Sequence, residues 1–269
     1  MSSESKSVNP SHPAAQRLRI VLVGTQHPGN MGSAARAMKT MGLARLVLVA
    51  PEKRPNEESY ALAAGADDVL GDAVICQTLA EAVADCRMVL GCTARSRRVQ
   101  LEELMPREAA ARAVAQAGAG AEVALVFGRE RTGLTNDELQ LCHASVHIPA
   151  NPDYSSLNLA AAVQVLSYEL RLALLDAASG EGNADADAAA AQEDPRELPA
   201  SHAELEGFFA QLADTLDAID FHKGRAPESA MRKLRRLYLR AGLDVREVRI
   251  LRGILADAQR MAMLAGSKR

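Results

Sequence analysis

Residues 18–36 read LRIVLVGTQHPGNMGSAAR, an apolar run followed by a turn and by the start of a helical pattern. The first six residues are almost continuously aliphatic, as expected of a strand that is buried on both faces of a parallel sheet. Pro28 and Gly29 mark the turn, and Asn30 is predicted to cap the following helix. A strand that passes directly into a helix predicts an α/β fold, in which ligands bind beside the carboxyl ends of the strands.

The helix predicted over residues 31–41 has two unlike faces. Its methionines and most of its alanines follow the spacing of a core-facing stripe, whereas Gly32 and Arg36 lie one turn apart on the opposite side. Because glycine has no Cβ atom, we expect a ligand to approach the helix at Gly32, below the Arg36 guanidinium. The turn contains neither GxGxxG nor GK[ST], so no dinucleotide fingerprint or P-loop is indicated. Taken alone, the stretch leaves an ordinary turn with a surface arginine equally open.

The alternation of apolar runs and helical patterns continues to about residue 176. Strands are predicted at 18–24, 44–50, 87–93, 122–128 and 145–149, with a weaker one at 67–70, and helices at 31–41, 57–64, 79–84, 106–117, 135–142 and 157–175. We therefore predict an α/β domain over residues 18–176, with a mostly parallel sheet and helices on both faces.

The composition restricts the class of protein. The chain has 269 residues, 48% of them hydrophobic, which is enough for a substantial core. Its four cysteines show no CxxC spacing and residues 1–17 lack the apolar core of a signal peptide, so we predict a cytoplasmic protein with reduced thiols and a disordered tail over residues 1–17. No run of about 18 apolar residues predicts a membrane span. Aromatic residues make up only 3%, which argues against a base-stacking platform.

The net charge of −3 hides an asymmetry along the chain. Residues 177–200 are acidic and rich in alanine and glycine, and are predicted to form a flexible linker. Residues 201–269 are predicted to form a helical extension, which opens with a capping box at Ser201 and Glu204. Residues 223–252 include ten Lys or Arg but only three Asp or Glu. A solvated helical face remains open, but the cluster within one predicted helix favours phosphate binding by Arg232, Lys233, Arg235, Arg236 and Arg240.

Polar loops follow several of the predicted strands. GRERTGLTNDEL follows the strand at 122–128, NPDYSSLN follows the strand at 145–149, and TARSR follows the strand at 87–93. Since parallel strands end at the same edge of a sheet, we expect these loops to converge with the turn at 26–30. Convergence of this kind is the usual construction of a small-ligand site.

Three spaced motifs carry a resemblance to a known family. NxGxxxR at 30–36, FGRExxGL at 127–134 and IPxxxxxxSLN at 148–158 resemble the motifs of the SpoU family of RNA 2′-O-methyltransferases, in the SPOUT superfamily. The longer strings around them are similar to a branch that methylates the ribose of cytidine or uridine 32 in the tRNA anticodon loop. The resemblance is strong over residues 18–176 and looser over the basic extension.

The resemblance implies a catalytic domain whose C-terminal part forms a trefoil knot, a homodimer that completes the site, tRNA as partner, and S-adenosyl-L-methionine (SAM) as cofactor. The implied cofactor contacts are Thr93, Ala94, Arg95, Phe127, Gly128, Arg129, Glu130, Gly133, Ile148, Ser156, Leu157 and Asn158. Glycine at 128 would also let a planar ring approach the backbone.

The resemblance further implies that Arg36, Asn30, Glu130 and Ser156 are catalytic, and that Arg36, Arg95 and Arg97 contact RNA. A guanidinium donates hydrogen bonds and does not accept them, so we expect Arg36 to orient the ribose and its phosphate and to stabilise developing negative charge. The identity of the proton acceptor stays open.

Several alternatives remain at this point. Glu130 could hold the turn by pairing with an arginine, and Ser156 or Asn158 could cap the following helix. The substrate could be another tRNA position or ribosomal RNA, and a non-catalytic RNA-binding factor could use the same scaffold. His143 and His147 do not share a predicted helix, so no metal site is expected.

Overall fold

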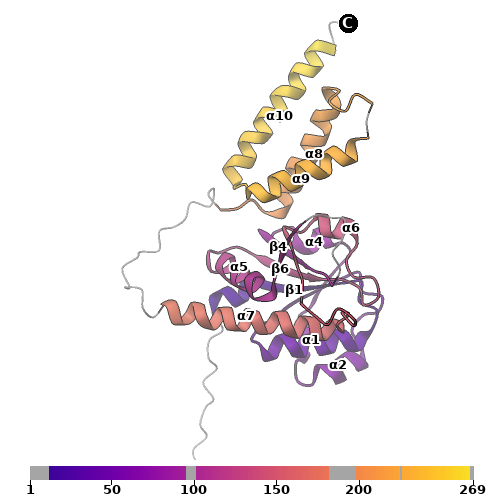
Figure 1. Ribbon diagram of the computed structural model, residues 1–269, viewed down its shortest axis with the longest axis vertical. Coiled ribbons are helices and arrows are strands. Elements are labelled where there is room, and N and C mark those ends of the chain that lie inside the picture. The colour runs from indigo at the N-terminus through magenta and orange to yellow at the C-terminus, as the bar shows by residue number, and fades with distance from the viewer. Residues whose placement is uncertain (1–11, 95–100, 182–197, 225, 267–269) are drawn as a thin grey trace, which may run out of the picture.

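The computed structural model describes residues 12–94, 101–181, 198–224 and 226–266. They form a sheet domain covered by helices and a separate unit of three helices, here called the helical unit, which lies at one end of the molecule (Figure 1). None of the described helices is long and apolar enough to cross a membrane.

The sheet has seven strands, and every pair of neighbours is parallel. Its strands are β1 (Leu18–Val23), β2 (Arg45–Val49), β3 (Val74–Cys76), β4 (Met88–Cys92), β5 (Glu102–Leu104), β6 (Val123–Phe127) and β7 (Ala144–Val146). The spatial order is β3-β2-β1-β6-β4-β7-β5, so β6 lies between β1 and β4, and β7 lies between β4 and β5. The predicted fold class is confirmed, while the knotted path implied by the resemblance stays a prediction.

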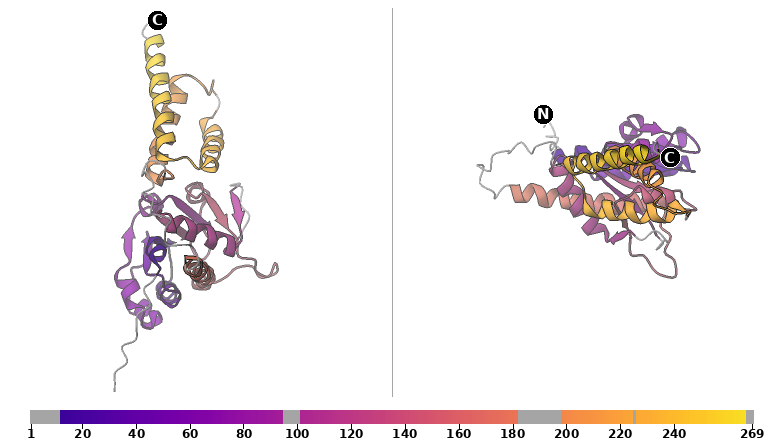
Figure 2. Two further views of the ribbon diagram at one scale, coloured as in Figure 1. Left: turned by 90° about the vertical axis from the view of Figure 1, so that its left-hand side faces the viewer. Right: turned by 90° about the horizontal axis from the view of Figure 1, so that it is seen from above.

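The two faces of the sheet carry different side chains. Leu18, Ile20 and Leu22 point to one face, and Val21 and Val23 point to the other, as the period of two along a strand requires. The first face is covered by α1 (Pro28–Thr40), α2 (Glu57–Ala63), α3 (Asp67–Gly71), α5 (Pro106–Gly118) and α7 (Leu159–Glu181). The second face packs against the shorter helices α4 (Leu79–Val83) and α6 (Asn136–Gln140), on the side of the sheet that faces the helical unit (Figures 1 and 2).

Some expectations about the elements are wrong. Residues 67–71 form a helix, because both aspartates lie in its first turn, and the edge strands β3 and β5 were not expected. Residues 13–17 form a 3-10 helix whose alanines are buried, so they are not part of a disordered tail. Helix α7 continues to Glu181, and Ala200 is buried, so a flexible linker over the whole of 177–200 is also wrong. Residues 1–11 and 182–197 lie outside the described residues.

The helical unit consists of α8 (His202–Ala218), α9 (Pro227–Ala241) and α10 (Val245–Gly266). The predicted capping box at Ser201 and Glu204 is present at the start of α8. The core of the unit is aromatic and aliphatic: the rings of Phe208 and Tyr238 meet edge to face at 4.9 Å, and Phe209 packs beside them.

The first turn of α8 attaches the helical unit to the sheet domain. The backbone N–H groups of His202 and Ala203 donate to the carbonyl oxygens of Cys86 and Ala84, at 2.8 and 3.0 Å. Arg87 donates to the carbonyl oxygen of Pro199. These contacts use helix-end N–H groups that have no partner within α8. They lie just before β4, and therefore at the amino edge of the sheet.

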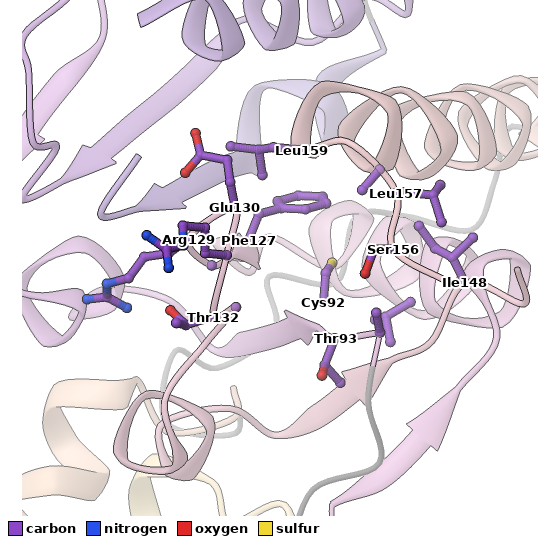
Figure 3. Close-up of a pocket in the computed structure, with 16 residues that line it drawn as sticks. Cys92, Thr93, Phe127, Arg129, Glu130, Thr132, Ile148, Ser156, Leu157 and Leu159 are labelled. Carbon is purple, nitrogen blue, oxygen red and sulfur yellow. The ribbon is translucent and has the colours of Figure 1, made fainter. Parts of the chain in front are cut away.

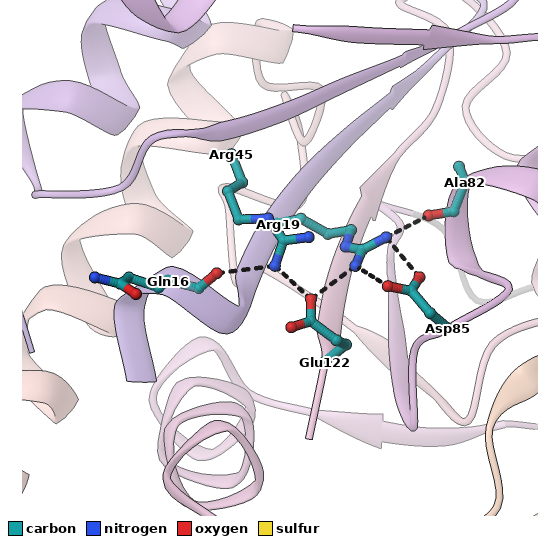
Figure 4. A network of polar contacts seen from close by, with 6 residues as sticks. All are labelled: Gln16, Arg19, Arg45, Ala82, Asp85 and Glu122. Carbon is teal, nitrogen blue, oxygen red and sulfur yellow. Dashed lines mark hydrogen bonds and ion pairs between the residues drawn. The ribbon is translucent and has the colours of Figure 1, made fainter. Parts of the chain in front are cut away.

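An ion network around the buried Arg19 holds the same edge together (Figure 4). The Arg19 guanidinium donates to Asp85 at 2.6 and 2.8 Å, to Glu122 at 2.7 Å and to the carbonyl oxygen of Ala82 at 3.0 Å. Arg45 pairs with the same Glu122 carboxylate. Burial by itself raises the pKa of Asp85, but the hydrogen bond and charge of Arg19 bring it below its usual value. The network ties β1 and β6 to the loop that receives α8.

Candidate cofactor pocket and active site

A pocket opens at the carboxyl ends of β4, β6 and β7 (Figure 3). The space within its walls is about 830 Å³, a figure that includes the open mouth. Its lining comprises Cys92, Thr93, Ala94, Phe127, Gly128, Arg129, Glu130, Arg131, Thr132, Gly133, Val146, Ile148, Ser156, Leu157, Leu159 and Ala162. The structure thus brings together three loops that are far apart in the sequence.

The walls combine an apolar surface with a few polar groups. Phe127, Ile148 and Leu157 supply the apolar part, and Ser156 lies between them (Figure 3). Thr93 adds a second hydroxyl-bearing residue to the lining. A cofactor with a flat heterocycle and a polar amino-acid end needs this combination. The residues present therefore fit SAM.

Gly128 is required by the path of the chain. A Cβ atom on this residue would lie 2.2 Å from backbone atoms of both Gly133 and Leu134, because the loop folds back on itself through the bridge between Arg129 and Gly133. The expectation that Gly128 leaves space for a ligand ring is wrong, since its own loop fills that space.

The reason given for Gly32 is also wrong. A Cβ atom there would lie 1.9 Å from the carbonyl oxygen of Ser59, which belongs to α2. Ser59 is itself buried, and its hydroxyl donates to the carbonyl oxygen of Pro28 at 2.8 Å. The glycine thus allows α1 and α2 to pack closely, and no ligand can approach at this point.

A chain of hydrogen bonds connects the three motifs. The Glu130 carboxylate accepts from the backbone N–H groups of Gln26 and His27 at 3.1–3.2 Å, and from Asn30 Nδ2 at 3.0 Å. Asn30 Oδ1 accepts from Asn158 Nδ2 at 3.2 Å, and Asn158 Oδ1 accepts from the backbone N–H of Ala160 at 2.9 Å. Each amide donates in one direction and accepts in the other, so the chain fixes the orientation of both asparagines.

This arrangement changes the expected roles. Helix α1 begins at Pro28, so Asn30 is not its N-cap; instead, Glu130 supplies an anion at the helix N-terminus from a neighbouring loop. Burial raises the pKa of Glu130, but the hydrogen bonds from Asn30 and the backbone outweigh it and leave the pKa below its usual value. Glu130 therefore stays ionised, and within the described residues it forms no ion pair with an arginine.

The Arg129 side chain leaves the pocket. Its guanidinium donates to both oxygens of Glu138, at 3.0 and 3.1 Å, and points away from the pocket in Figure 3. Glu138 in turn completes a capping box with Thr135 at the start of α6. Arg129 thus contributes its backbone to the pocket and uses its charge to hold the loop.

The remaining predicted site residues fall into three groups. Arg36 is exposed on α1 outside the pocket lining, and its guanidinium has no hydrogen-bond or ion-pair partner within the described residues. Asn158 also lies outside the lining. Its side chain caps α7, which was the alternative to a cofactor contact. Arg95 and Arg97 lie outside the described residues.

The predicted RNA-binding cations of the basic helix α9 fall into two groups: one contacts the rest of the helical unit, and the others are exposed. Arg235 pairs with Glu206, and its guanidinium lies 4.4 Å from the centre of the Phe209 ring, so it already has partners within the helical unit. Its predicted RNA contact stays a prediction. The other four predicted residues are exposed: Arg232, Lys233, Arg236 and Arg240.

The pocket includes residues that the sequence analysis missed, among them Cys92, Val146 and Leu159. Cys92 and Val146 end β4 and β7, so strand-end positions adjacent to the polar loops could have pointed to them. Burial raises the pKa of the Cys92 thiol, which keeps it protonated and unreactive. The described part of the chain has no cluster of three or more His, Cys, Asp or Glu placed to hold a metal ion.

Comparisons with known proteins agree with these motifs. Residues 17–168 match the model of the SpoU rRNA methylase family, and residues 203–267 match that of the TrmJ C-terminal domain. The chain is 53% identical over 244 residues to the TrmJ tRNA (cytidine/uridine-2′-O-)-methyltransferase of Salmonella typhimurium, covering 91% of this chain and 97% of that protein. The corresponding Escherichia coli K12 protein is 52% identical, over 91% and 96% of the two chains.

Solved structures give the same result. The crystal structure of TrmJ from Z. mobilis ZM4 superposes with a TM-score of 0.74 at 35% identity, covering 89% of this chain and 97% of that one. A methylase family protein from Haemophilus influenzae Rd KW20 superposes at 0.58, with 43% identity over 93% and 99%. The chain therefore belongs to the TrmJ branch of the SpoU methylase family.

Proposed function

We propose that this protein transfers a methyl group from SAM to the ribose 2′-hydroxyl of cytidine or uridine at position 32 of tRNA, in the cytoplasm. The observation that carries the proposal is the pocket at the carboxyl edge of the sheet, which is formed by the second and third SpoU motifs and the loop after β4. The first motif lies outside its lining and is joined to the other two by the hydrogen bonds of Asn30. The high identity to tRNA (cytidine/uridine-2′-O-)-methyltransferases supports the choice of substrate.

The cofactor, when bound, supplies an electrophilic methyl group on a sulfonium. A neutral hydroxyl is a weak nucleophile, so this chain must hold the ribose in line and favour loss of its proton. Ser156 offers a hydroxyl within the pocket lining that can hydrogen-bond to the cofactor or to the nucleotide. We assign the apolar wall formed by Phe127, Ile148 and Leu157 to the heterocycle.

Arg36 is proposed to hold the RNA at the reacting nucleotide. Its exposed guanidinium has no hydrogen-bond or ion-pair partner in the described chain, so it can bind a phosphate or stabilise developing alkoxide charge. It remains a donor throughout, and the proton acceptor is therefore another group, such as a substrate phosphate or water.

Asn30, Glu130 and Asn158 are proposed to act as positioning residues. Their hydrogen bonds connect the loop at 128–133, the first turn of α1 and the first turn of α7. The acceptor positions of Glu130 face these donors, which disfavours a role as general base. The three residues instead maintain the relative position of Arg36 and the pocket.

We further propose a homodimer, as the resemblance implies. Tyr168 and Leu175 are 50% and 44% exposed and lie two turns apart on α7, beside α1. Covering them with a second copy would bury apolar surface next to the helix that carries Arg36. Light scattering tests this proposal: Tyr168→Glu should shift a dimer towards monomer, and a wild-type monomer would reject it.

The first experiment is a methyl-transfer assay with labelled SAM and unmodified tRNA, followed by nuclease mapping. Label on the ribose of nucleotide 32 is the expected result. Label at another nucleotide would keep the chemistry and change the substrate. Binding of SAM without transfer to tRNA or to ribosomal RNA would favour a non-catalytic RNA-binding factor.

A further inference from the structure

A second, larger cavity lies between the helical unit and the amino edge of the sheet. Its space is about 1730 Å³ including the mouth, and its walls come from α9 on one side and from β4, β5, β7 and α5 on the other. It is therefore a groove between the two parts of the chain, at the opposite end of β4 from the cofactor pocket.

The groove is lined by five cations: Lys233, Arg236 and Arg240 from α9, and Arg87 and Arg112 from the sheet domain. Glu102 is the one carboxylate among the lining residues of the described chain. The lining therefore carries a net positive charge, although the whole protein has a net charge of −3.

Internal ion pairs neutralise only part of this charge. Arg112 is held by Glu102 and Glu108 at 2.8–2.9 Å. Arg87 donates to a carbonyl oxygen, which is uncharged. Within the part of the chain that the structure describes, neither Lys233 nor Arg240 has an ion-pair partner.

The cations of α9 follow one another along the groove. Lys233, Arg236 and Arg240 recur every three or four residues, so their side chains are about 5–6 Å apart on one face of the helix. Leu234 and Tyr238 pack into the core of the helical unit, and Arg235 is tied to Glu206. A row of this kind matches a row of phosphates better than a single compact anion.

We propose that this groove binds the sugar-phosphate backbone of the RNA substrate, so that the RNA is held between the helical unit and the amino edge of the sheet. The inference rests on the proposed function and extends it, because it assigns RNA contacts to the sheet-domain wall at Arg87 and Gln116 as well as to α9. A basic tail that binds RNA on its outer surface would leave that wall unused.

The first test compares two double variants of the full chain that remove equal charge from exposed positions. Lys233→Ala/Arg240→Ala removes two groove cations, and Arg246→Ala/Arg249→Ala removes two exposed cations of the helical unit that lie outside the groove lining. The slope of log affinity for tRNA against log salt should fall by roughly 1.4–1.8 for the groove variant, at about 0.7–0.9 per lost contact. The other variant should change it by less than half as much. Equal changes of the slope in the two double variants would overturn the proposal that the groove binds RNA.

The second test uses the opposite wall. Gln116 lies on α5, is partly exposed and lines the groove, so a charge placed there faces the bound backbone. Gln116→Lys should tighten tRNA binding and steepen the salt dependence, and Gln116→Glu should do the reverse. No difference between them would overturn the proposal, even if the α9 variants lose affinity. Failure of the proposed function would be distinct, because wild-type protein would then neither bind nor methylate tRNA.

Discussion

Glu130→Gln separates a positioning role for this carboxylate from a catalytic one. The substitution keeps an oxygen acceptor of the same reach but removes the charge that faces the N–H groups of Gln26 and His27 and the amide of Asn30. A partly buried anion at a helix N-terminus contributes about 0.3–2 kcal/mol. Since Glu130 is partly exposed, we expect the free energy of unfolding to fall by about 1 kcal/mol.

The kinetic consequence should be small. Loss of a general base lowers turnover by roughly 10²–10⁴-fold, whereas a slightly displaced helix end should lower it by less than about tenfold. The assay is methyl transfer to tRNA at saturating SAM, together with calorimetric SAM affinity and urea denaturation. Glu52→Gln is a matched control, because within the described residues the one hydrogen bond that the Glu52 carboxylate accepts comes from the Gln26 side chain, at 2.8 Å. Its turnover should match the wild type.

A thousandfold loss of turnover by Glu130→Gln, with stability and SAM affinity unchanged, would refute the positioning role. The role also predicts coupling along the hydrogen-bond chain. A double-mutant cycle of Glu130→Gln with Asn158→Ala should give an interaction free energy of about 0.5 kcal/mol or more, because both act through Asn30. An additive cycle would show that the three residues do not act together.

Three further predictions concern other parts of the molecule. Arg36→Ala should abolish turnover and leave SAM affinity intact, as calorimetry would measure; equal loss of both would place Arg36 in the cofactor pocket. Gly32→Ala should destabilise the protein by about 1–3 kcal/mol, because its Cβ atom meets the Ser59 carbonyl, whereas Gly253→Ala in open space on α10 should stabilise it by about 0.5–1 kcal/mol in urea denaturation. Burial, and then the nearby His143 and Arg235, lower the pKa of His202 to about 4. The unfolded chain therefore binds the proton first, and the free energy of unfolding should fall by up to about 3 kcal/mol between pH 6.5 and 4. A His202→Gln variant that keeps the whole slope would contradict this.

The central strands could be predicted from the sequence because burial on both faces leaves a continuous aliphatic run. The edge strands could not: Val74 is 60% exposed in β3, and β5 begins with two exposed glutamates. A partly exposed edge strand does not require the continuous aliphatic run by which a buried strand is recognised. The run at 67–70 was misread because a short segment with two apolar residues fits a helix as well as a strand.

The site was predictable where local chemistry decides it. The polar loops were expected to converge, since parallel strands end at one edge, and the structure places most of their predicted residues around one pocket. The uses of Gly32 and Arg235 were not predictable, because each depends on a partner from a distant segment: the α2 backbone for the glycine, and Glu206 for the arginine. The sequence does not indicate which face of a helix receives another helix.

The order of strands in the sheet has a consequence for how the chain reaches this structure. Strand β6 enters between β1 and β4, so Leu18 pairs with Val123, and β7 enters between β4 and β5, which both precede it in the chain. Pairings between residues so distant in sequence form slowly, because the entropy of closing a long loop is lost before any stabilising contact forms. The loops at 128–133 and 148–158 follow these inserted strands. We therefore expect the pocket to be among the last parts of the domain to acquire its shape, and ligand binding there to report that the sheet is complete.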